Sequence, residues 1–365
     1  MKKLMAVAAS LSFAAANSAV AQSNVTLYGI VDTGISYYNH ATAQGGSSIG
    51  MPTLTGELPS RWGMKGAEDI GGGNKIFFVL ENGFQPATGA LNYGGRLFGR
   101  QANVGLSTKY GVLTLGRQMN MTLYTLANLD VIGPSVHSMP NLDPYLANAR
   151  SDNAIGYMLK YLGFTVGGTY SFGRDAAGPA GPSATNCAGQ VAGDMLACRQ
   201  YTAMLAYDAA QFGVAASYDA ARGGTGASAP LNSSAYTSTR TVVGGYWAFG
   251  GGKVGFGWVR NNQAALTHLQ TDIFFLGATY FITPSLSVDG EGLRYLRRTS
   301  NSAGDTSATY LISRLNYLLS KRTTAYASLG YMLNSTNGAL PVAAGGSVGP
   351  GSNQFGAMVG LQQKF

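Results

Sequence analysis

The residue types that perform catalysis are few in this 365-residue chain, and their spacing does not favour it. Its three histidines, His40, His137 and His268, fall in expected loops, and none has a serine or aspartate partner at an informative spacing for nucleophilic or general-base chemistry. The Gly-Gly-Gly stretches lack the Lys-Ser/Thr pair that a phosphate-binding loop requires. We therefore expect no catalytic residues, metal site or cofactor, and a membrane-barrel protease or lipase is the weaker alternative.

The basic side chains offer a different chemistry, the attraction of small anions. The chain has 24 Lys and Arg against 16 Asp and Glu, and beyond the N-terminal Lys2-Lys3 two basic residues adjoin only at 297–298 and 321–322. This scatter argues against a nucleic-acid partner. In a strand, Arg61 shares a face with Lys65, and Arg150 shares a face with Asp152. A plain ion pair within a strand wall is the alternative role for each arginine.

The elements that must position these side chains are strands. Charged residues make up 11% of the chain, against roughly 25% in soluble globular domains, while 52 Gly and 21 Tyr are present. In the segment 324–333 the apolar set Ala325, Leu329 and Tyr331 alternates with Thr324, Tyr326 and Ser328. Polar residues inward and apolar residues outward are typical of a membrane barrel with a wet interior. A secreted β-helix or sandwich is the alternative on composition alone.

Both ends of the chain indicate export to a membrane. Met1-Lys-Lys3 is basic, residues 4–16 form an apolar run too short to span a bilayer, and Ala19-Val-Ala21 has the form of a cleavage site. We expect residues 1–21 to be a secretory signal peptide and residues 22–365 to be a transmembrane β-barrel; a buried N-terminal helix is the alternative for the first segment. At the other end, an alternating strand closes on Phe365, and lipid is the obvious cover for its apolar face.

Turn-forming clusters divide the chain into sixteen expected antiparallel strands, joined by links that are alternately short and long. No stretch after the signal peptide holds 18 consecutive apolar residues, which excludes a spanning helix. Short links on one rim and long links on the other are typical of a membrane barrel, although 14 or 18 strands remain alternatives. The expected strands are 25–38, 57–69, 75–85, 97–107, 111–118, 151–161, 163–173, 200–209, 212–221, 239–249, 253–263, 270–282, 285–297, 307–319, 322–334 and 353–365.

The link from Met119 to Ala149 is too long and too apolar for a simple connection. It has no strand period, contains three prolines, and carries Asp130 and Asp143. A structureless loop of this length is usually functional or disordered. We expect it to lie against the inner wall and narrow the lumen, with Asp130 or Asp143 opposite basic wall residues. Packing on the rim or on a neighbouring subunit is the alternative.

The two cysteines, Cys187 and Cys198, lie close together in a segment rich in Gly, Ala and Pro. In an oxidising compartment a disulfide within a loop is the natural expectation. Two free thiols or a metal pair are poorer interpretations, because no histidine or further cysteine lies near them.

Several motifs resemble those of the trimeric general porins of Gram-negative outer membranes, particularly the β-proteobacterial type. The resemblance runs from Gln22 to the end and is strongest over residues 25–118. The motifs that carry it are Val25-Thr-Leu-Tyr-Gly-Ile-Val-Asp32, Ser60-Arg-Trp-Gly-Met-Lys-Gly-Ala-Glu-Asp-Ile-Gly-Gly-Gly73, Phe98-Gly-Arg-Gln-Ala-Asn-Val-Gly-Leu106, Leu115-Gly-Arg-Gln118 and the terminal Phe365.

The resemblance implies a sixteen-stranded, homotrimeric barrel whose third extracellular loop folds inward to form the constriction. It implies that Arg61, Arg100 and Arg150, with Lys65 beside Arg61, form a basic ladder on the wall. Arg100 is out of step with this reading, because it falls in register with Ala102, Val104 and Leu106; a bulge near Gly99 would be needed to turn it inward.

The same resemblance assigns Asp130 and Asp143 as the acidic loop residues and Phe365 as the address that the assembly machinery reads. Because the loop has fewer carboxylates than in the enterobacterial relatives, we expect a net positive constriction. The implied function is passive diffusion of small hydrophilic solutes, with mild selectivity for anions. Outer-membrane lipid and lipopolysaccharide are the expected surroundings. A structural or adhesive barrel that does not conduct is the alternative.

Overall fold

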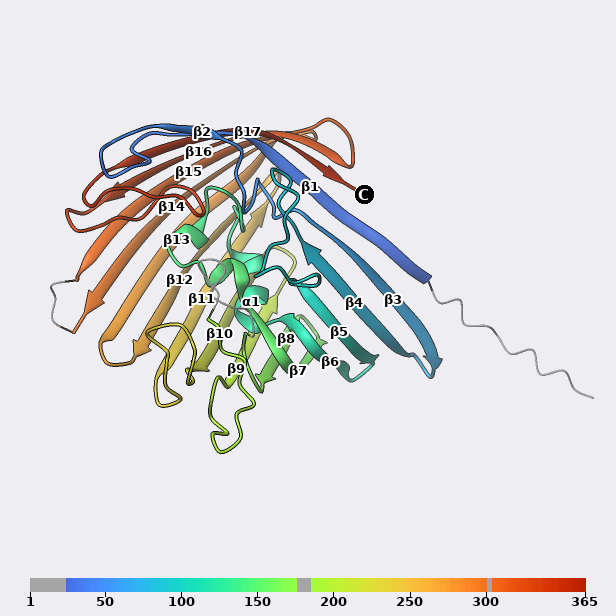
Figure 1. Ribbon diagram of the computed structural model, residues 1–365. Helices are drawn as coiled ribbons and strands as arrows, with labels where there is room; N and C mark the ends of the chain where they lie inside the picture. Colours follow the sequence, from blue (N-terminus) through green and yellow to red (C-terminus); the bar gives the residue numbers. More distant parts are fainter. Residues whose placement is uncertain (1–23, 176–184, 301–303) are drawn as a thin grey trace, which may run out of the picture.

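The computed structural model describes residues 24–175, 185–300 and 304–365, so the expected signal peptide, residues 1–21, lies outside the described residues. The described residues form one antiparallel sheet of seventeen strands, sixteen of them long, that curves into a barrel (Figure 1). The strands are β1 (Asn24–Tyr38), the three-residue β2 (Ser48–Gly50), β3 (Arg61–Gly71), β4 (Asn74–Gly83), β5 (Gln101–Thr108), β6 (Gly111–Met119), β7 (Arg150–Tyr161), β8 (Phe164–Ser171), β9 (Gln200–Asp208), β10 (Phe212–Arg222), β11 (Thr237–Phe249), β12 (Gly252–Ala264), β13 (His268–Thr283), β14 (Leu286–Thr299), β15 (Thr306–Leu318), β16 (Thr323–Asn334) and β17 (Gln354–Lys364).

Strand β1 closes the barrel, because it pairs with β3 along one edge and with β17 along the other. The last residue takes part in this closure: the Gly29 amide donates to the Phe365 carbonyl at 3.0 Å, and the Phe365 amide donates to the Gly29 carbonyl at 3.1 Å. A closed ring leaves no unpaired strand edge, which is the condition for backbone at the depth of a membrane. The expected fold class, a sixteen-stranded antiparallel transmembrane β-barrel, is confirmed.

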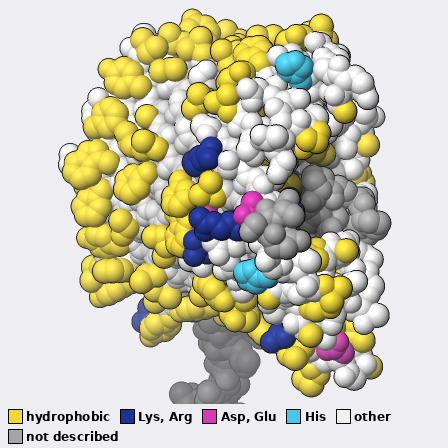
Figure 2. Space-filling view, turned by 90° about the vertical axis from the view of Figure 1, so that its left-hand side faces the viewer, with side chains coloured by type: hydrophobic (Ala, Val, Ile, Leu, Met, Phe, Trp, Pro, Cys, Tyr) yellow, Lys and Arg dark blue, Asp and Glu magenta, His cyan; other side chains and the backbone are white. Residues whose placement is uncertain are grey.

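Alternation along the strands separates an apolar outer face from a polar inner face. In β1, Leu27 and Ile35 are exposed on the outside, whereas Asp32 and Ser36 are buried on the inside. In β16, Leu329 and Tyr331 point outward and Ser328 points inward, as the sequence pattern predicts. Hydrophobic side chains cover much of the wall that Figure 2 shows. Among the described residues, no helix is long and apolar enough to cross a membrane.

Two strand boundaries differ from the expected ones in a way that matters for the charged residues. β5 begins at Gln101 rather than at residue 97, because residues 97–100 form turns and bends and the Leu97 carbonyl accepts a hydrogen bond from the Asn82 side chain. β13 begins at His268, which the sequence places in a loop.

The segment from Asn120 to Ala149, which we call the inner loop, lies against the inner wall. It begins with helix α1 (Met121–Leu129), which Asn120 caps and which contacts β8 to β12, and continues through two short 3-10 turns, η1 (Met139–Asn141) and η2 (Leu146–Asn148). Figure 1 shows α1 inside the ring of strands. A Cβ on Gly255 would lie 2.0 Å from the Leu129 carbonyl oxygen, so only glycine lets the helix end approach β12 this closely.

Further along, the inner loop is fastened to β15 and β16. The Ile132 carbonyl accepts a hydrogen bond from Arg314 at 3.1 Å, and the His137 ring nitrogen Nδ1 lies 2.9 Å from the Ser328 hydroxyl. The loop therefore crosses the lumen instead of capping the rim.

Cys187 and Cys198 form a disulfide in the long link between β8 and β9. Both cysteines are buried together with Ala227 of the link between β10 and β11. The bridge therefore holds a local cluster that joins two neighbouring long links.

Candidate pore constriction

Four arginine side chains gather on the inner face of strands β3 to β7 and the bend before β5. We call this group the arginine cluster: Arg61, Arg100, Arg117 and Arg150. Arg100 and Arg61 share the carboxylate of Glu81, with N–O distances of 2.6 and 3.9 Å. Arg100 and Arg150 share the ring of Tyr93, with guanidinium carbons 6.0 and 5.4 Å from its centre.

Strand alternation brings Arg61 to this place, whereas Arg150 lies beyond a shift in the pairing of β7 with β6. Arg61 opens β3 opposite the inward-facing Ile30 of β1. Arg150 opens β7, is only 3% exposed, and donates from Nη1 to the Ala147 carbonyl at 2.9 Å. Its Nε is buried and, within the part of the chain that the structure describes, has no hydrogen-bond partner. Arg150 therefore leaves one buried donor of the cluster unused.

Arg100 reaches the cluster from outside any strand. β5 begins at Gln101, the residue after Arg100. The strand alternation that would turn Arg100 toward lipid therefore does not apply to it. Its amide still donates to the Glu81 carbonyl at 3.1 Å, while its side chain is buried and donates to Glu81 Oε1 and to the Tyr93 hydroxyl. A bend before β5, rather than a bulge near Gly99, gives Arg100 its inward direction.

Arg117 is a member that the sequence reasoning missed. It lies in the Leu115-Gly-Arg-Gln118 motif, where alternation offers no reason to choose it. The pairing of β6 with β7 shifts between Gly116 and Gln118, and the Arg117 side chain reaches Asp152, with an Nη1–Oδ1 distance of 2.5 Å. Positive φ angles at Gly116, 114°, and at Asn153, 48°, mark this irregularity in the two strands, and neither is visible in the sequence.

The other expected site residues lie apart from the cluster. Lys65 is on the same face of β3 as Arg61, four residues further along, with its ammonium 5.3 Å from the centre of the Tyr28 ring. Asp143 pairs with Arg240 of β11 at 2.8 Å. Asp130 accepts hydrogen bonds from the amides of its own loop at Ile132 and Gly133, at 2.9 and 2.7 Å. Both loop carboxylates are thus engaged with partners outside the arginine cluster.

The local charge around Tyr93 is positive. Four guanidinium groups of the cluster face two carboxylates, Glu81 and Asp152, and Asp152 is also paired with Arg96 at 3.1 Å. Burial alone would raise the pKa of the Tyr93 hydroxyl, yet the positive charges of Arg100, Arg150 and Arg117 hold this pKa below its ordinary value. An anion entering here would be stabilised by the same charges.

The comparisons with known proteins agree with the barrel geometry. Residues 6–337 match the family described as "Gram-negative porin". An outer membrane porin protein of Bordetella pertussis is 37% identical over 196 residues, a match that spans 47% of this chain and 48% of that protein. Outer membrane porin protein 32 of Delftia acidovorans is 29% identical over the full length of both chains.

Among solved structures, the "anion-selective porin from Comamonas acidovorans" is similar to this chain with a TM-score of 0.76 and 25% identity. The superposition covers 94% of this chain and all of that one.

The attachment of the inner loop at His137 should weaken in acid. The ring is fully buried between the loop and β16, and burial lowers its pKa to about 4. In a detached loop the pKa would be about 6.5. The attached state therefore binds fewer protons than the detached state, so attachment is at full strength above about pH 6.5 and loses up to about 3 kcal/mol as the pH falls to 4.

We expect single-channel current fluctuations to increase between pH 6.5 and 4, and His137→Gln to remove this pH dependence. His40→Gln, at an exposed histidine, is the matched control and should behave as wild type. An unaltered pH dependence in His137→Gln would show that another group controls the loop.

Proposed function

The chain belongs to the Gram-negative porin family, and from this premise we propose that its water-filled channel passes small hydrophilic solutes passively and favours anions. It is an outer-membrane porin, and its barrel, exposed apolar wall and inner loop are the parts that such a channel needs. What the lumen selects is decided by the charges at its narrowest part.

The observation that carries the proposal is that both carboxylates of the inner loop have partners outside the arginine cluster. Asp143 is neutralised by Arg240 and Asp130 is held by backbone amides, so neither opposes the arginine cluster. Arginine remains charged at any physiological pH, and several arginines lining one wall create a field that concentrates small anions. The similarity to a porin described as anion-selective supports the same direction.

Replacing Arg61 and Arg150 by glutamine together should lower the permeability ratio of chloride to potassium by about twofold or more, because two of the four clustered charges are removed. The measurement is the reversal potential in a salt gradient across a planar bilayer. The control is the double variant Lys321→Gln/Arg322→Gln, which removes two charges from the exposed turn between β15 and β16. A reversal potential equal to that of wild type in the Arg61/Arg150 variant would remove these residues from the selectivity mechanism.

In the same recordings, closure in three equal steps is the behaviour expected of a homotrimer.

A second proposal concerns lipid contacts on the outside of the barrel. Arg260, Arg294 and Arg298 lie on the outward faces of β12 and β14, toward the rim at which β14 ends. Arg260 and Arg298 pair with Asp272 at 2.7 and 3.7 Å, whereas Arg294 donates to hydroxyl groups of β15. Figure 2 shows basic side chains gathered beside the apolar wall. We propose that Arg260, Arg294 and Arg298 bind the phosphate groups of lipopolysaccharide.

The double variant Arg294→Gln/Arg298→Gln tests this contact and leaves the Arg260–Asp272 pair in place. A basic residue near an anionic membrane surface contributes about 1 kcal/mol, so the affinity for purified lipopolysaccharide should fall about thirtyfold. Binding is measured by native mass spectrometry, with Lys321→Gln/Arg322→Gln as the control. Equal retention of lipopolysaccharide by both variants would contradict the assignment.

The last proposal is that Phe365 acts in assembly and not in conduction. Phe365 is 47% exposed and its ring lies over Gly29 on the outer face of the barrel, whereas the neighbouring Arg61 points inward; its backbone bonds to Gly29 do not need the ring. Phe365→Ala should lower the amount of barrel in the outer membrane, while channels that do assemble keep wild-type conductance. Phe281→Ala, at another exposed aromatic near a strand end, is the control; equal yields of the two variants would argue against a special role for Phe365.

A further inference from the structure

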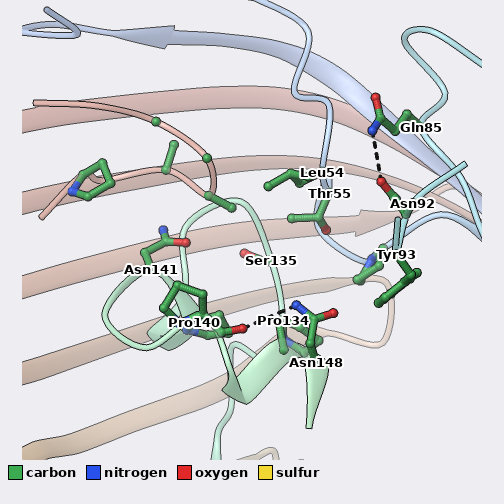
Figure 3. A pocket seen from close by; sticks show the side chains of 18 of the residues that line it. Leu54, Thr55, Gln85, Asn92, Tyr93, Pro134, Ser135, Pro140, Asn141 and Asn148 are labelled. Atoms are coloured by element: carbon green, nitrogen blue, oxygen red, sulfur yellow. Dashed lines mark hydrogen bonds between the residues drawn. The ribbon is translucent and has the colours of Figure 1, made fainter. Parts of the chain in front are cut away.

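A cavity of about 580 Å³ lies beside the arginine cluster, within the range of sites that bind small molecules. It is bounded by the inner loop, by the segments 54–59 and 85–95, and by residues 340–346. Figure 3 shows Leu54, Tyr93 and Pro140, from three of these segments, around the same space.

The lining of this cavity is unusual for a passage used by ions. Among the described residues that form it, none is charged, and the apolar members include Leu54, Leu91, Leu142, Pro134 and Pro140. Water-filled channels for small polar solutes need no such surface, because the solute keeps its hydration there. An apolar lining favours a solute that has hydrocarbon to remove from water.

Three lining residues connect this cavity directly to the guanidinium groups. The Pro59 carbonyl accepts from Arg61 Nη1 at 3.2 Å, and the Ala147 carbonyl accepts from Arg150 Nη1 at 2.9 Å. The Tyr93 ring, also in the lining, packs on Arg150. One side of the cavity is therefore apolar and neutral, and the other is backed by positive charge.

A ligand in the cavity can reach only part of this positive charge. The Arg61 side chain is 21% exposed, which leaves part of it open to a ligand, whereas Arg150 is buried and contributes positive charge without direct access. A carboxylate at this end would receive charge-assisted hydrogen bonds, and a planar guanidinium suits it well.

We propose that this cavity is a binding subsite for amphiphilic organic anions, meaning small carboxylates that carry an aromatic or branched aliphatic body. The carboxylate lies at the arginine cluster, and the hydrocarbon body lies against the leucines and prolines of the lining. The proposal rests on the anion selectivity proposed above, and it names the class of anion that the site holds longest.

The test uses the full-length protein in planar bilayers with potassium chloride and three probes: benzoate, acetate and benzyl alcohol. Benzoate and acetate share the carboxylate, whereas benzoate and benzyl alcohol share the ring. We expect benzoate to block the current at a concentration about tenfold lower than acetate does, because ring burial adds to the ionic contact. Benzyl alcohol should block less than benzoate.

The lining itself is tested by Leu54→Asn/Leu91→Asn, which makes two partly exposed lining side chains polar with little change in size. This variant should keep wild-type conductance and reversal potential but need as much benzoate as acetate for half block. Leu266→Asn, at a leucine that is 87% exposed outside the cavity, is the control and should retain the wild-type preference.

The possible outcomes separate the two proposals. A wild-type channel without anion preference in its reversal potential contradicts the proposed function. An anion-selective channel that benzoate and acetate block equally overturns the subsite alone. Equal block by benzoate and benzyl alcohol also overturns it, because the carboxylate would then make no contribution. These comparisons use wild-type protein and do not depend on a variant folding.

Discussion

The anion preference that we propose for this channel depends on which partners the two carboxylates of the inner loop have. Asp143 lies 2.8 Å from Arg240 on one wall, and Asp130 turns back on the amides of its own loop. The arginine cluster on the other side is left with Glu81 and Asp152. If either loop carboxylate faced the cluster, the excess of positive charge there would be smaller. As built, one wall keeps an excess of positive charge.

The attachment of the inner loop to the wall fixes this distribution of charge. Helix α1 packs on β8 to β12, Gly255 lets its last turn touch the wall, and Arg314 and His137 fasten the following segment to β15 and β16. The same prolines and leucines that make the loop too apolar to be a flexible tail also form one side of the cavity beside Tyr93. Constriction, charge separation and an apolar surface thus arise from a single folded segment.

The sequence predicts the barrel well because its signals are local. Alternation recurs along nearly every strand and short turns join successive strands, and the alternation of β3 also places Arg61 on the inner face. Arg100 and Arg117 escape such reasoning because one lies in a bend before β5 and the other at a shift in strand pairing. Asp143 and Arg240 are 97 residues apart, so no local pattern indicates their pairing. For these residues tertiary folding, not a local pattern, decides where the charge lies.

The most direct test of this account is to locate halide ions in crystals of the protein soaked in bromide, by anomalous diffraction. The account predicts bromide beside Arg61 and Arg150, on the side of the lumen away from Asp143. Bromide absent from the arginine cluster while present elsewhere in the lumen, or rubidium bound at the cluster in a parallel soak, would contradict it.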